Sequence, residues 1–234
     1  MVVEVMVKIG IPLRYSHLSD DRPILYLGEK VRRTFQKAGA FIIPIVQNQD
    51  IDYANSKYEE PVVLTEKEKE EIDKYLDMVD GVVFPGGFKI TIFDEYLLER
   101  CIERDIPTLG ICLGMQLMSC YKDKFFVDKN ESVINHRQEN DDVLTHKVIV
   151  NKDSYLYKIL EKEEIMVNSF HRYHVSPNEY FTVSSRSEDN YIESIEMKNK
   201  KFIMGVQWHP EISYDFDDNS KKLIDYFISI CEEK

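Results

Sequence analysis

Short apolar segments alternate with amphipathic helical segments through the first half of the chain, and this order narrows the possible folds sharply. The apolar segments are short, β-branched and suited to buried strands. Because parallel strands need long crossover connections, which are usually helices, the alternation predicts a parallel sheet covered by helices. Ligand-binding groups then gather at the carboxyl ends of the strands. The predicted strands are 2–12, 41–46, 81–84 and 106–111, and the predicted helices are 23–37, 66–79, 93–103 and one that opens after Cys112.

Local signals mark the ends of several helices. Pro23 suits the first turn of its helix, and Gly39 suits a cap after Lys37. Thr65 and Glu68 have the spacing of a capping box. The second half of the chain is less regular, with strands predicted near 146–150, 165–168, 181–185, 191–196 and 202–207 and a final amphipathic helix that contains Leu223, Ile224, Phe227 and Ile228.

The composition indicates an ordinary globular protein. Of the 234 residues, 43% are hydrophobic and 31% are charged, which is enough apolar side chain to exclude disorder over most of the length. The length suits one hydrophobic core, so we predict a single domain over residues 1–234. A net charge of −12 disfavours nucleic acid and anionic membrane surfaces as partners.

The N-terminal segment does not have the pattern of a signal peptide, because Glu4 and Lys8 interrupt its apolar residues. No apolar run approaches the roughly 20 residues that a membrane span needs. We therefore expect a cytoplasmic protein. The 4 cysteines form no Cys-x-x-Cys pair, so no disulfide framework is expected either.

Cys112 lies in the segment Gly110-Ile-Cys-Leu-Gly114, between a predicted strand and a predicted helix. A sharp strand-to-helix turn needs small residues on both sides of its centre, and it projects the central side chain clear of the core. The helix N-terminus also favours thiolate over thiol. In a chain of this composition, the number of cysteines expected by chance to have Gly both two residues before and two residues after them is only about 0.006. Cys112 is predicted to be a nucleophile rather than a buried hydrophobe, whereas the core is expected for Cys101, Cys120 and Cys231.

A thiol nucleophile needs a proton acceptor, usually a histidine that a third polar group orients. His209 follows the apolar run 202–208, and Glu211 comes two residues later. Residues i and i+2 of an extended chain point to the same side, so the Glu211 carboxylate can orient the His209 imidazole. The segment alone would suit a solvated surface pair, but together with Cys112 it predicts a Cys-His-Glu triad.

The other histidines give no clear ligand pattern. His171 and His174 are three residues apart, but no third ligand with recognisable zinc spacing accompanies them. His17, His136 and His146 are expected in loops or at the surface. We therefore predict neither a metal site nor a cofactor.

The turn Phe84-Pro-Gly-Gly87 follows a predicted strand. Attack on a carbonyl group creates an oxyanion that needs N–H donors, and the amides of Gly87 and Leu113 are candidates for this oxyanion hole. A plain Pro-Gly turn is the alternative interpretation of this segment.

Taken together, the segments GICLGMQ, PGG and GVQWHPE resemble the class I glutamine amidotransferase superfamily of triad hydrolases. The chain is most similar there to the peptidase C26 group, which includes γ-glutamyl-γ-aminobutyrate hydrolases and folate γ-glutamyl hydrolases. Val167-Asn-Ser-Phe-His171 resembles the VNS-x-H segment of the γ-aminobutyrate hydrolase group, and Gly205–Glu211 matches its terminal motif residue for residue. The likeness extends over essentially the whole chain.

The resemblance implies a flavodoxin-like three-layer α/β sandwich, with a mostly parallel central sheet and a smaller antiparallel extension. It implies that Cys112 is the nucleophile, that His209 is the general base and acid, and that Glu211 orients it. It also implies that Gly87 and Leu113 form the oxyanion hole. The residues implied to hold the γ-glutamyl group are Gln116, Asn168, Ser169 and His171.

This chain differs from two groups of the superfamily, and the differences bear on its substrate and on the branch to which it belongs. Relatives named after putrescine breakdown carry Arg after the nucleophile and a longer loop after PGG, whereas this chain has Leu113 and the short segment 88–91. The identity of the leaving amine is therefore not implied. The DJ-1-like branch places His directly after the cysteine, and Leu113 argues against that branch.

Three functions follow as hypotheses. The first is a stand-alone hydrolase of a small γ-glutamyl amide, which needs no cofactor and works through a γ-glutamyl thioester. The second is a glutaminase subunit that delivers ammonia to a separate synthase. The third is a catalytically silent binding protein that has kept the pocket. A homodimer is also compatible with the sequence, although the amphipathic C-terminal helix could equally pack on its own sheet.

Overall fold

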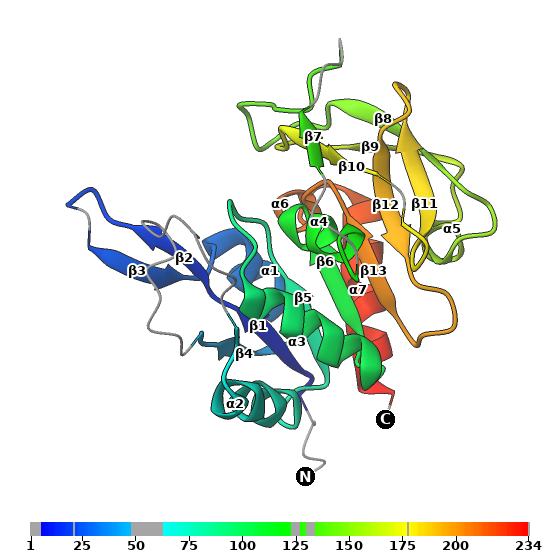
Figure 1. The fold of residues 1–234 in the computed structure, drawn as a ribbon. Helices are drawn as coiled ribbons and strands as arrows, with labels where there is room; N and C mark the ends of the chain where they lie inside the picture. The colour runs from blue at the N-terminus through cyan, green and yellow to red at the C-terminus, as the bar shows by residue number, and fades with distance from the viewer. Residues whose placement is uncertain are drawn as a thin grey trace.

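The computed structural model describes residues 6–20, 22–47, 63–122, 127–129, 134–176 and 178–233. Within these ranges a single nine-stranded sheet runs through the molecule (Figure 1). Its strands are β1 Lys8–Pro12, β4 Phe41–Ile45, β5 Gly81–Phe84, β6 Thr108–Ile111, β8 His146–Val150, β9 Glu164–Val167, β11 Thr182–Ser187, β12 Ile192–Glu196 and β13 Ile203–Val206. They are ordered β4-β1-β5-β6-β13-β12-β11-β8-β9.

The sheet has a parallel part and an antiparallel extension. Neighbours from β4 to β13 pair in parallel. Neighbours from β13 to β9 pair antiparallel. Two small antiparallel sheets lie outside it, one formed by β2 Arg14–His17 with β3 Pro23–Tyr26 and one by β7 Val127–Lys129 with β10 Tyr173–Val175. The predicted parallel sheet with an antiparallel extension is confirmed.

Helices cover both faces of the sheet. They are α1 Glu29–Lys37, α2 Glu66–Leu76, α3 Ile92–Glu103, α4 Leu113–Ser119, α5 Tyr155–Leu160, α6 Pro210–Ser213 and α7 Asp218–Glu232. One hydrophobic core contains residues of α1, α5 and α7, and a second contains residues of α2, α3 and α4. Along β5, Val83 belongs to the first core whereas Val82 and Phe84 belong to the second, as expected for side chains that alternate across a strand. The result is a three-layer arrangement (Figure 1).

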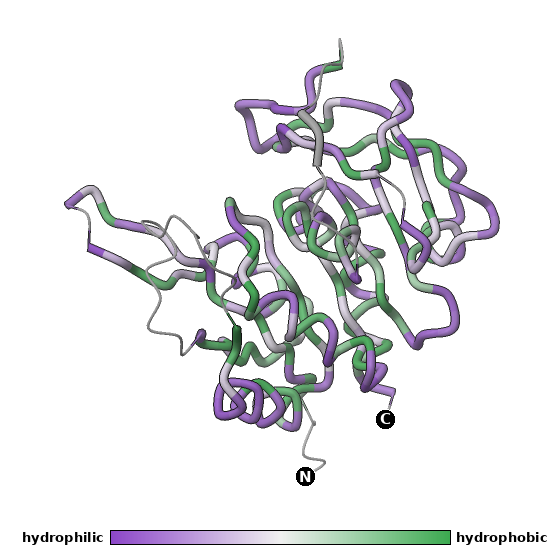
Figure 2. Tube along the Cα trace, in the orientation of Figure 1, coloured by the Kyte–Doolittle hydropathy of each residue, from purple (hydrophilic) through white to green (hydrophobic). Residues whose placement is uncertain are grey.

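The distribution of hydrophobic residues agrees with the three-layer arrangement. Figure 2 shows hydrophobic stretches along the central strands and mostly hydrophilic residues around α2. The apolar face predicted for the last helix packs onto the chain's own sheet, where Leu223, Ile224, Phe227 and Ile228 are buried. No helix of the described residues is both long and apolar enough to span a bilayer.

The predicted capping signals agree with the structure, but two predicted helix ends do not, and one of them is the end of α2, which lies at Leu76 rather than at Val79. Thr65 and Glu68 form the predicted capping box, and Gly39 follows α1 with a φ of 96°. The helix predicted from Pro23 is wrong in its first turns, since Pro23–Tyr26 is β3 and the helix begins at Glu29. Antiparallel pairing with β2 supplies β3 with hydrogen-bond partners that a local helix signal cannot reveal.

Three adjacent parallel strands bring the candidate site segments to one edge of the sheet. Phe84, the last residue of β5, pairs with Gly110 of β6, and Ile111 at the end of β6 pairs with Val206 at the end of β13. The Cys112 amide also donates to the Val206 carbonyl oxygen at 2.8 Å. The PGG turn, Cys112 and the segment that carries His209 therefore emerge side by side.

Close backbone packing explains the glycines on both sides of Cys112. A Cβ atom added to Gly110 would lie 2.7 Å from the carbonyl carbon of Gly114. A Cβ atom added to Gly114 would overlap the carbonyl oxygen of Phe84 in β5. Only glycine fits at either position, because the neighbouring atoms belong to the backbone and cannot move aside like a flexible side chain.

This packing predicts a strong effect for Gly114→Ala. We expect it to lower the free energy of unfolding by about 1–3 kcal/mol or more, because α4 must move away from β5 to relieve the overlap. Gly28→Ala is the control, since its Cβ atom would lie 3.7 Å from Val31, an ordinary contact. That control should change stability by at most about 0.5 kcal/mol. Urea unfolding followed by circular dichroism measures both, and equal stabilities would contradict the packing argument.

Candidate active site

Cys112 occupies a strained turn between β6 and α4. Its φ of 52° and ψ of −99° lie outside the regions that non-glycine residues normally adopt. The residue is the N-cap of α4 and is 9% exposed. Strain of this kind persists where the surrounding structure enforces it, as the strand pairing and the two glycines do here. The predicted strand-turn-helix geometry around Cys112 is confirmed.

The side chains of Cys112 and His209 converge on the PGG turn. A Cβ atom added to Gly86 would lie 2.8 Å from Cε1 of His209 and 3.7 Å from Cβ of Cys112. The Nδ1 atom of His209 lies 2.7 Å from Oε1 of Glu211, which is buried. The carboxylate can only accept, so Nδ1 donates and the other ring nitrogen is available to the thiol. The three residues predicted as a triad therefore come together.

Electrostatics at the site favour a protonated imidazole. Burial by itself would lower the pKa of His209, but the charges of Glu211 and Cys112 and hydrogen bonds to both raise it well above the ordinary value of 6.5. A neighbouring anion stabilises imidazolium, and imidazolium in turn stabilises a thiolate. The arrangement can hold the nucleophile and its proton on two adjacent groups.

Asn168 fixes the backbone of His209 on both sides of that residue's Cα atom. Its Oδ1 atom accepts from the His209 amide at 2.8 Å, and its Nδ2 atom donates to the His209 carbonyl oxygen at 2.7 Å. The ring of Phe170 contacts the His209 imidazole edge-on with centroids 5.5 Å apart. Thr34 of α1 donates to the Glu211 carbonyl oxygen at 2.8 Å. His209 is thus held by segments that are far apart in the sequence.

The PGG turn is locked by a buried ion pair that the sequence did not reveal. Arg14 of β2 donates to Asp94 Oδ1 at 2.8 Å and to the Pro85 carbonyl oxygen at 2.7 Å. Asp94 also completes a capping box with Thr91 at the start of α3. A Cβ atom added to Gly87 would lie 3.1 Å from a Leu113 methyl group and 3.2 Å from Arg14, so Gly87 and Leu113 are neighbours. No motif or spacing in the sequence singles out Arg14.

The four residues expected to hold a γ-glutamyl group are all buried and bonded within the protein. Gln116 donates to Gln207 Oε1 at 3.3 Å, and Asn168 holds His209 as described above. Ser169 Oγ donates to the His136 carbonyl oxygen at 2.7 Å, and His171 Nδ1 donates to the Tyr173 carbonyl oxygen at 2.9 Å. Contact between these side chains and a substrate stays a prediction.

His171 belongs to a buried cluster of residue types that ligate metals. His136, His146 and His171 surround the carboxylate of Glu193 on β12. His136 lies in a loop as predicted, but His146 begins β8, and the alternative of a surface position is wrong for both because each is only 3% exposed. Burial lowers the pKa of His136 despite the hydrogen bond that its ring donates to Asp189. Burial raises the pKa of Glu193, but its interactions with the adjacent His146 and His171 rings outweigh burial and hold the pKa at about 2.

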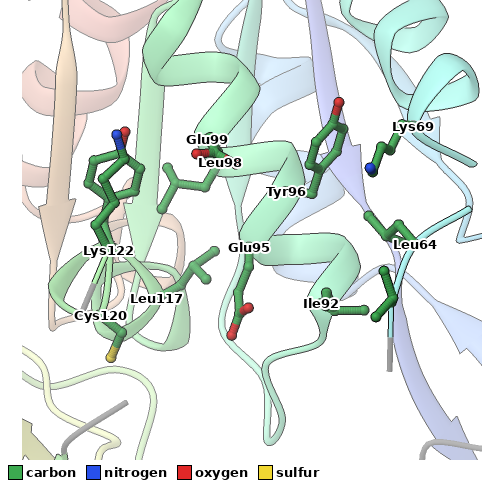
Figure 3. A pocket seen from close by; sticks show the side chains of 12 residues that line it. Leu64, Lys69, Ile92, Glu95, Tyr96, Leu98, Glu99, Leu117, Cys120 and Lys122 are labelled. Atoms are coloured by element: carbon green, nitrogen blue, oxygen red, sulfur yellow. The ribbon is translucent and has the colours of Figure 1, made fainter. Parts of the chain in front are cut away.

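Two cavities border the elements that carry the site. One of about 380 Å³ lies beside the PGG turn and is lined by Arg14, Tyr15, Ser16, His17, Gln47, Phe88, Lys89 and Thr91. The other, of about 370 Å³, lies along α3 and reaches α2 and the end of α4 (Figure 3). Its lining includes Cys120 and Leu117 from the far end of the helix that Cys112 begins. Arg14 and Phe88 place the first cavity beside the PGG turn, but the linings of both cavities leave out Cys112, His209, Gly87 and Leu113.

Comparison with known proteins decides the family. The model of the peptidase C26 family matches residues 91–211, more than half of the chain, and the match includes all three residues of the predicted triad. The chain belongs to the peptidase C26 family. A family of this glutamine amidotransferase and peptidase type supports a hydrolase.

Individual relatives of this peptidase C26 protein are similar over most of its length. The glutamine amidotransferase-like protein YvdE of Lactococcus lactis is 28% identical over 192 residues, which cover 71% of this chain and 80% of that protein. The CTP synthase of Sulfurisphaera tokodaii is 32% identical over 177 residues, 62% of this chain and 33% of that protein.

A solved structure extends the likeness to the fold. The glutaminase domain of Trypanosoma brucei CTPS, solved with bound acivicin, aligns with a TM-score of 0.66 at 18% identity, covering 97% of this chain and 94% of that one. The predicted flavodoxin-like sandwich is thereby confirmed for this peptidase C26 protein.

The raised pKa of His209 gives a direct test of the predicted triad geometry. In Glu211→Gln the carboxylate charge is lost, so the pKa of His209 should fall, as measured by NMR titration of its ring nitrogens. Because the folded pKa lies above the unfolded one, the stabilisation from this pair is full below about pH 6.5 and is lost as the pH rises through the folded value. Asp215→Asn is the control, since Asp215 is exposed and pairs with Lys37. Equal shifts in both variants would contradict a specific role for Glu211.

Proposed function

We propose that this protein is a cysteine hydrolase that cleaves the γ-glutamyl amide bond of a small γ-glutamyl compound. The observation that carries the proposal is the meeting of Cys112 with the His209–Glu211 pair at the carboxyl ends of adjacent strands. Membership of the peptidase C26 family supports the hydrolase class. The restriction to γ-glutamyl amides follows from the resemblance of its motifs to γ-glutamyl hydrolases.

The proposed reaction begins with the Cys112 thiolate. Its sulfur attacks the γ-carbonyl carbon, a C–S bond forms, and the carbonyl π electrons move to the oxygen. When the tetrahedral intermediate collapses, the C–N bond breaks and His209 gives its proton to the leaving amine. A water molecule then attacks the thioester while His209 takes up one of its protons. The C–S bond breaks, and glutamate and the thiolate are released.

The same geometry supports a role for two backbone amides in stabilising the oxyanion. Gly87 and Leu113 are neighbours, and Leu113 is the first residue of α4, where N–H groups lack partners inside the helix. Donors fixed in advance stabilise developing charge without having to reorganise. The Arg14–Asp94 pair keeps the turn in place, and Arg14 also lines the 380 Å³ cavity beside it.

A glutaminase subunit that delivers ammonia to a separate synthase is the second candidate. Its specific support is the 32% identity with the Sulfurisphaera tokodaii CTP synthase and the fold shared with a CTPS glutaminase domain. The chemistry at Cys112 would be the same, with glutamine as substrate and ammonia as leaving group. The two candidates differ in whether the isolated chain is active.

Replacement of the nucleophile tests the proposal. Cys112→Ala should lower kcat/KM for γ-glutamyl amides by at least about 10³-fold, because no other group can form the thioester. Cys120→Ala is the control, since this half-buried cysteine lies at the other end of α4, and it should retain activity. Release of glutamate from a panel of γ-glutamyl amines, glutamine and the α-glutamyl isomers is measured by mass spectrometry.

The outcomes separate the hypotheses. Steady hydrolysis of γ-glutamyl amines by the isolated chain supports the proposed hydrolase. Hydrolysis of glutamine that appears only when a synthase is added supports the subunit. Unchanged turnover by Cys112→Ala would contradict both, and a wild-type chain that never forms a thioester with any of the substrates would indicate a binding protein.

The hydrogen bonds of Asn168 predict a positioning effect on catalysis. Asn168→Asp replaces the donor to the His209 carbonyl oxygen with an acceptor, so the histidine should shift from its productive position. We expect kcat to fall by about 10²-fold with KM little changed. Asn178→Asp alters a similar side chain that bonds the Ser119 carbonyl oxygen instead, and it should leave kcat intact. A rise in KM at constant kcat would instead indicate that Asn168 binds the substrate.

A further inference from the structure

Four buried side chains outside the predicted triad meet in the antiparallel part of the molecule. His136 precedes β8, His146 begins it, His171 follows β9, and Glu193 lies on β12. Each is at most 3% exposed. The Oε1 atom of Glu193 lies 3.3 Å from His146 Nε2, 3.5 Å from His171 Nε2 and 3.6 Å from His136 Nδ1. Three imidazole nitrogens therefore surround one carboxylate oxygen.

The outer hydrogen bonds of two histidines determine which nitrogen faces the centre as a lone pair. Asp189 lies 2.9 Å from Nε2 of His136, and an ionised carboxylate only accepts, so Nε2 carries the proton. The Tyr173 carbonyl oxygen likewise accepts from Nδ1 of His171. In the neutral rings, His136 Nδ1 and His171 Nε2 are then acceptors directed at Glu193. Acceptors that face an anionic oxygen in a buried site repel one another unless a cation lies between them.

The inner distances are too long for charge-assisted hydrogen bonds. Such bonds between imidazolium and carboxylate measure about 2.7–2.9 Å, whereas the three separations here are 3.3–3.6 Å. Among the described residues, no hydrogen bond reaches Nδ1 of His136, either ring nitrogen of His146 or either carboxylate oxygen of Glu193. Buried polar atoms are almost always satisfied, so unpartnered atoms gathered around Glu193 Oε1 point to a bound ligand.

The distances do suit a four-coordinate transition-metal ion. Ligand atoms at about 2.0–2.1 Å from Zn²⁺ lie about 3.3–3.4 Å apart in a tetrahedron. The separations from Glu193 Oε1 are close to that value, and the ligand atoms of His136, His146 and Glu193 all lie within 4.8 Å of one another. Small side-chain rotations would bring them to bonding distance. Imidazole nitrogens with one carboxylate are a common zinc donor set.

The surroundings also match those of zinc-bound histidines. Metal-ligating histidines nearly always donate their second N–H to a carboxylate or a backbone carbonyl group, which fixes the ring. His136 does so to Asp189 and His171 does so to Tyr173. These bonds hold both rings with their inner nitrogens toward Glu193.

We propose that His136, His146, His171 and Glu193 bind one Zn²⁺ ion in a closed structural site. The sequence predicted no metal, because the four ligands come from four separate segments with no zinc spacing between them. Zinc binding would fix His171 next to Glu193 of the sheet extension. His171 ends the segment that contains Asn168 and Phe170, and both of these residues contact His209. The site is separate from the proposed nucleophile and does not depend on the proposed function.

Zinc binding to the whole chain tests the proposal. The protein is freed of metal with a chelator and titrated with Zn²⁺ alone, with heat of binding and bound metal per chain as readouts. We expect one Zn²⁺ per chain and a rise in melting temperature, because a ligand that binds only the folded state stabilises it. Replacement of Zn²⁺ by Co²⁺ should give the intense visible absorption of a four-coordinate ion.

Variants locate the ion. Glu193→Gln removes the charge at constant size and should weaken Zn²⁺ binding by at least about 10²-fold. Glu196→Gln is the matched control, because Glu196 is equally buried on β12 but accepts from the Tyr155 amide, and it should bind Zn²⁺ like the wild type. Cys112→Ala should also bind normally, which separates this site from zinc held by the Cys112 thiolate and His209.

Several results would overturn the proposal. These are the absence of stoichiometric Zn²⁺ binding by the wild type, equal binding by Glu193→Gln, or loss of binding in Cys112→Ala. If Glu193→Gln does not fold, X-ray absorption of the zinc-loaded wild type decides, since the proposal requires nitrogen and oxygen ligands only and a sulfur ligand would refute it. A protein that binds no zinc would instead hold this cluster by proton sharing among the histidines.

Discussion

The parallel pairing of β6 with β13 is the contact on which the site depends. It aligns Ile111 with Val206, so the residues that follow each strand leave the sheet at the same edge. Cys112 and His209 meet there although all four strands of the antiparallel extension lie between them in the chain. Neither residue needs its own long-range contact to find the other, because ladder hydrogen bonds and close glycine packing set both backbones. Asn168 and Phe170, which follow β9 of the extension, can then contact His209 through a hydrogen bond and a ring contact.

Buried polar groups supply the fine positioning around that edge. The Arg14–Asp94 pair holds the PGG turn, Asn168 holds the His209 backbone, and Glu211 holds the imidazole. Each such group costs free energy to remove from water, so it persists only where its partners satisfy it. The arrangement makes a site whose geometry is set before any substrate arrives, which is the condition for electrostatic stabilisation of a transition state. Glu193 and its three histidines form a second buried polar cluster, which the proposed Zn²⁺ ion would satisfy.

Local signals predicted whatever depends on near neighbours in the chain. The Thr65–Glu68 capping box, the alternation of strands and helices and the glycines around Cys112 are all short-range patterns, and the structure agrees with them. The helix predicted from Pro23 failed because a hairpin partner competed with the local preference. His136 and His146 were misplaced for a related reason. The local sequence around a histidine gives no sign of whether distant strands will cover it.

The amino-acid sequence by itself determined the α/β class, the strained turn at Cys112 and the adjacency of His209 to Glu211, because each follows from spacings of a few residues and from backbone sterics. Only the tertiary structure decided that Arg14 hydrogen-bonds the PGG turn, that Asn168 hydrogen-bonds the His209 backbone and that three histidines surround Glu193. Those contacts join residues from separate strands, and their formation depends on sheet order and register, which no local pattern specifies.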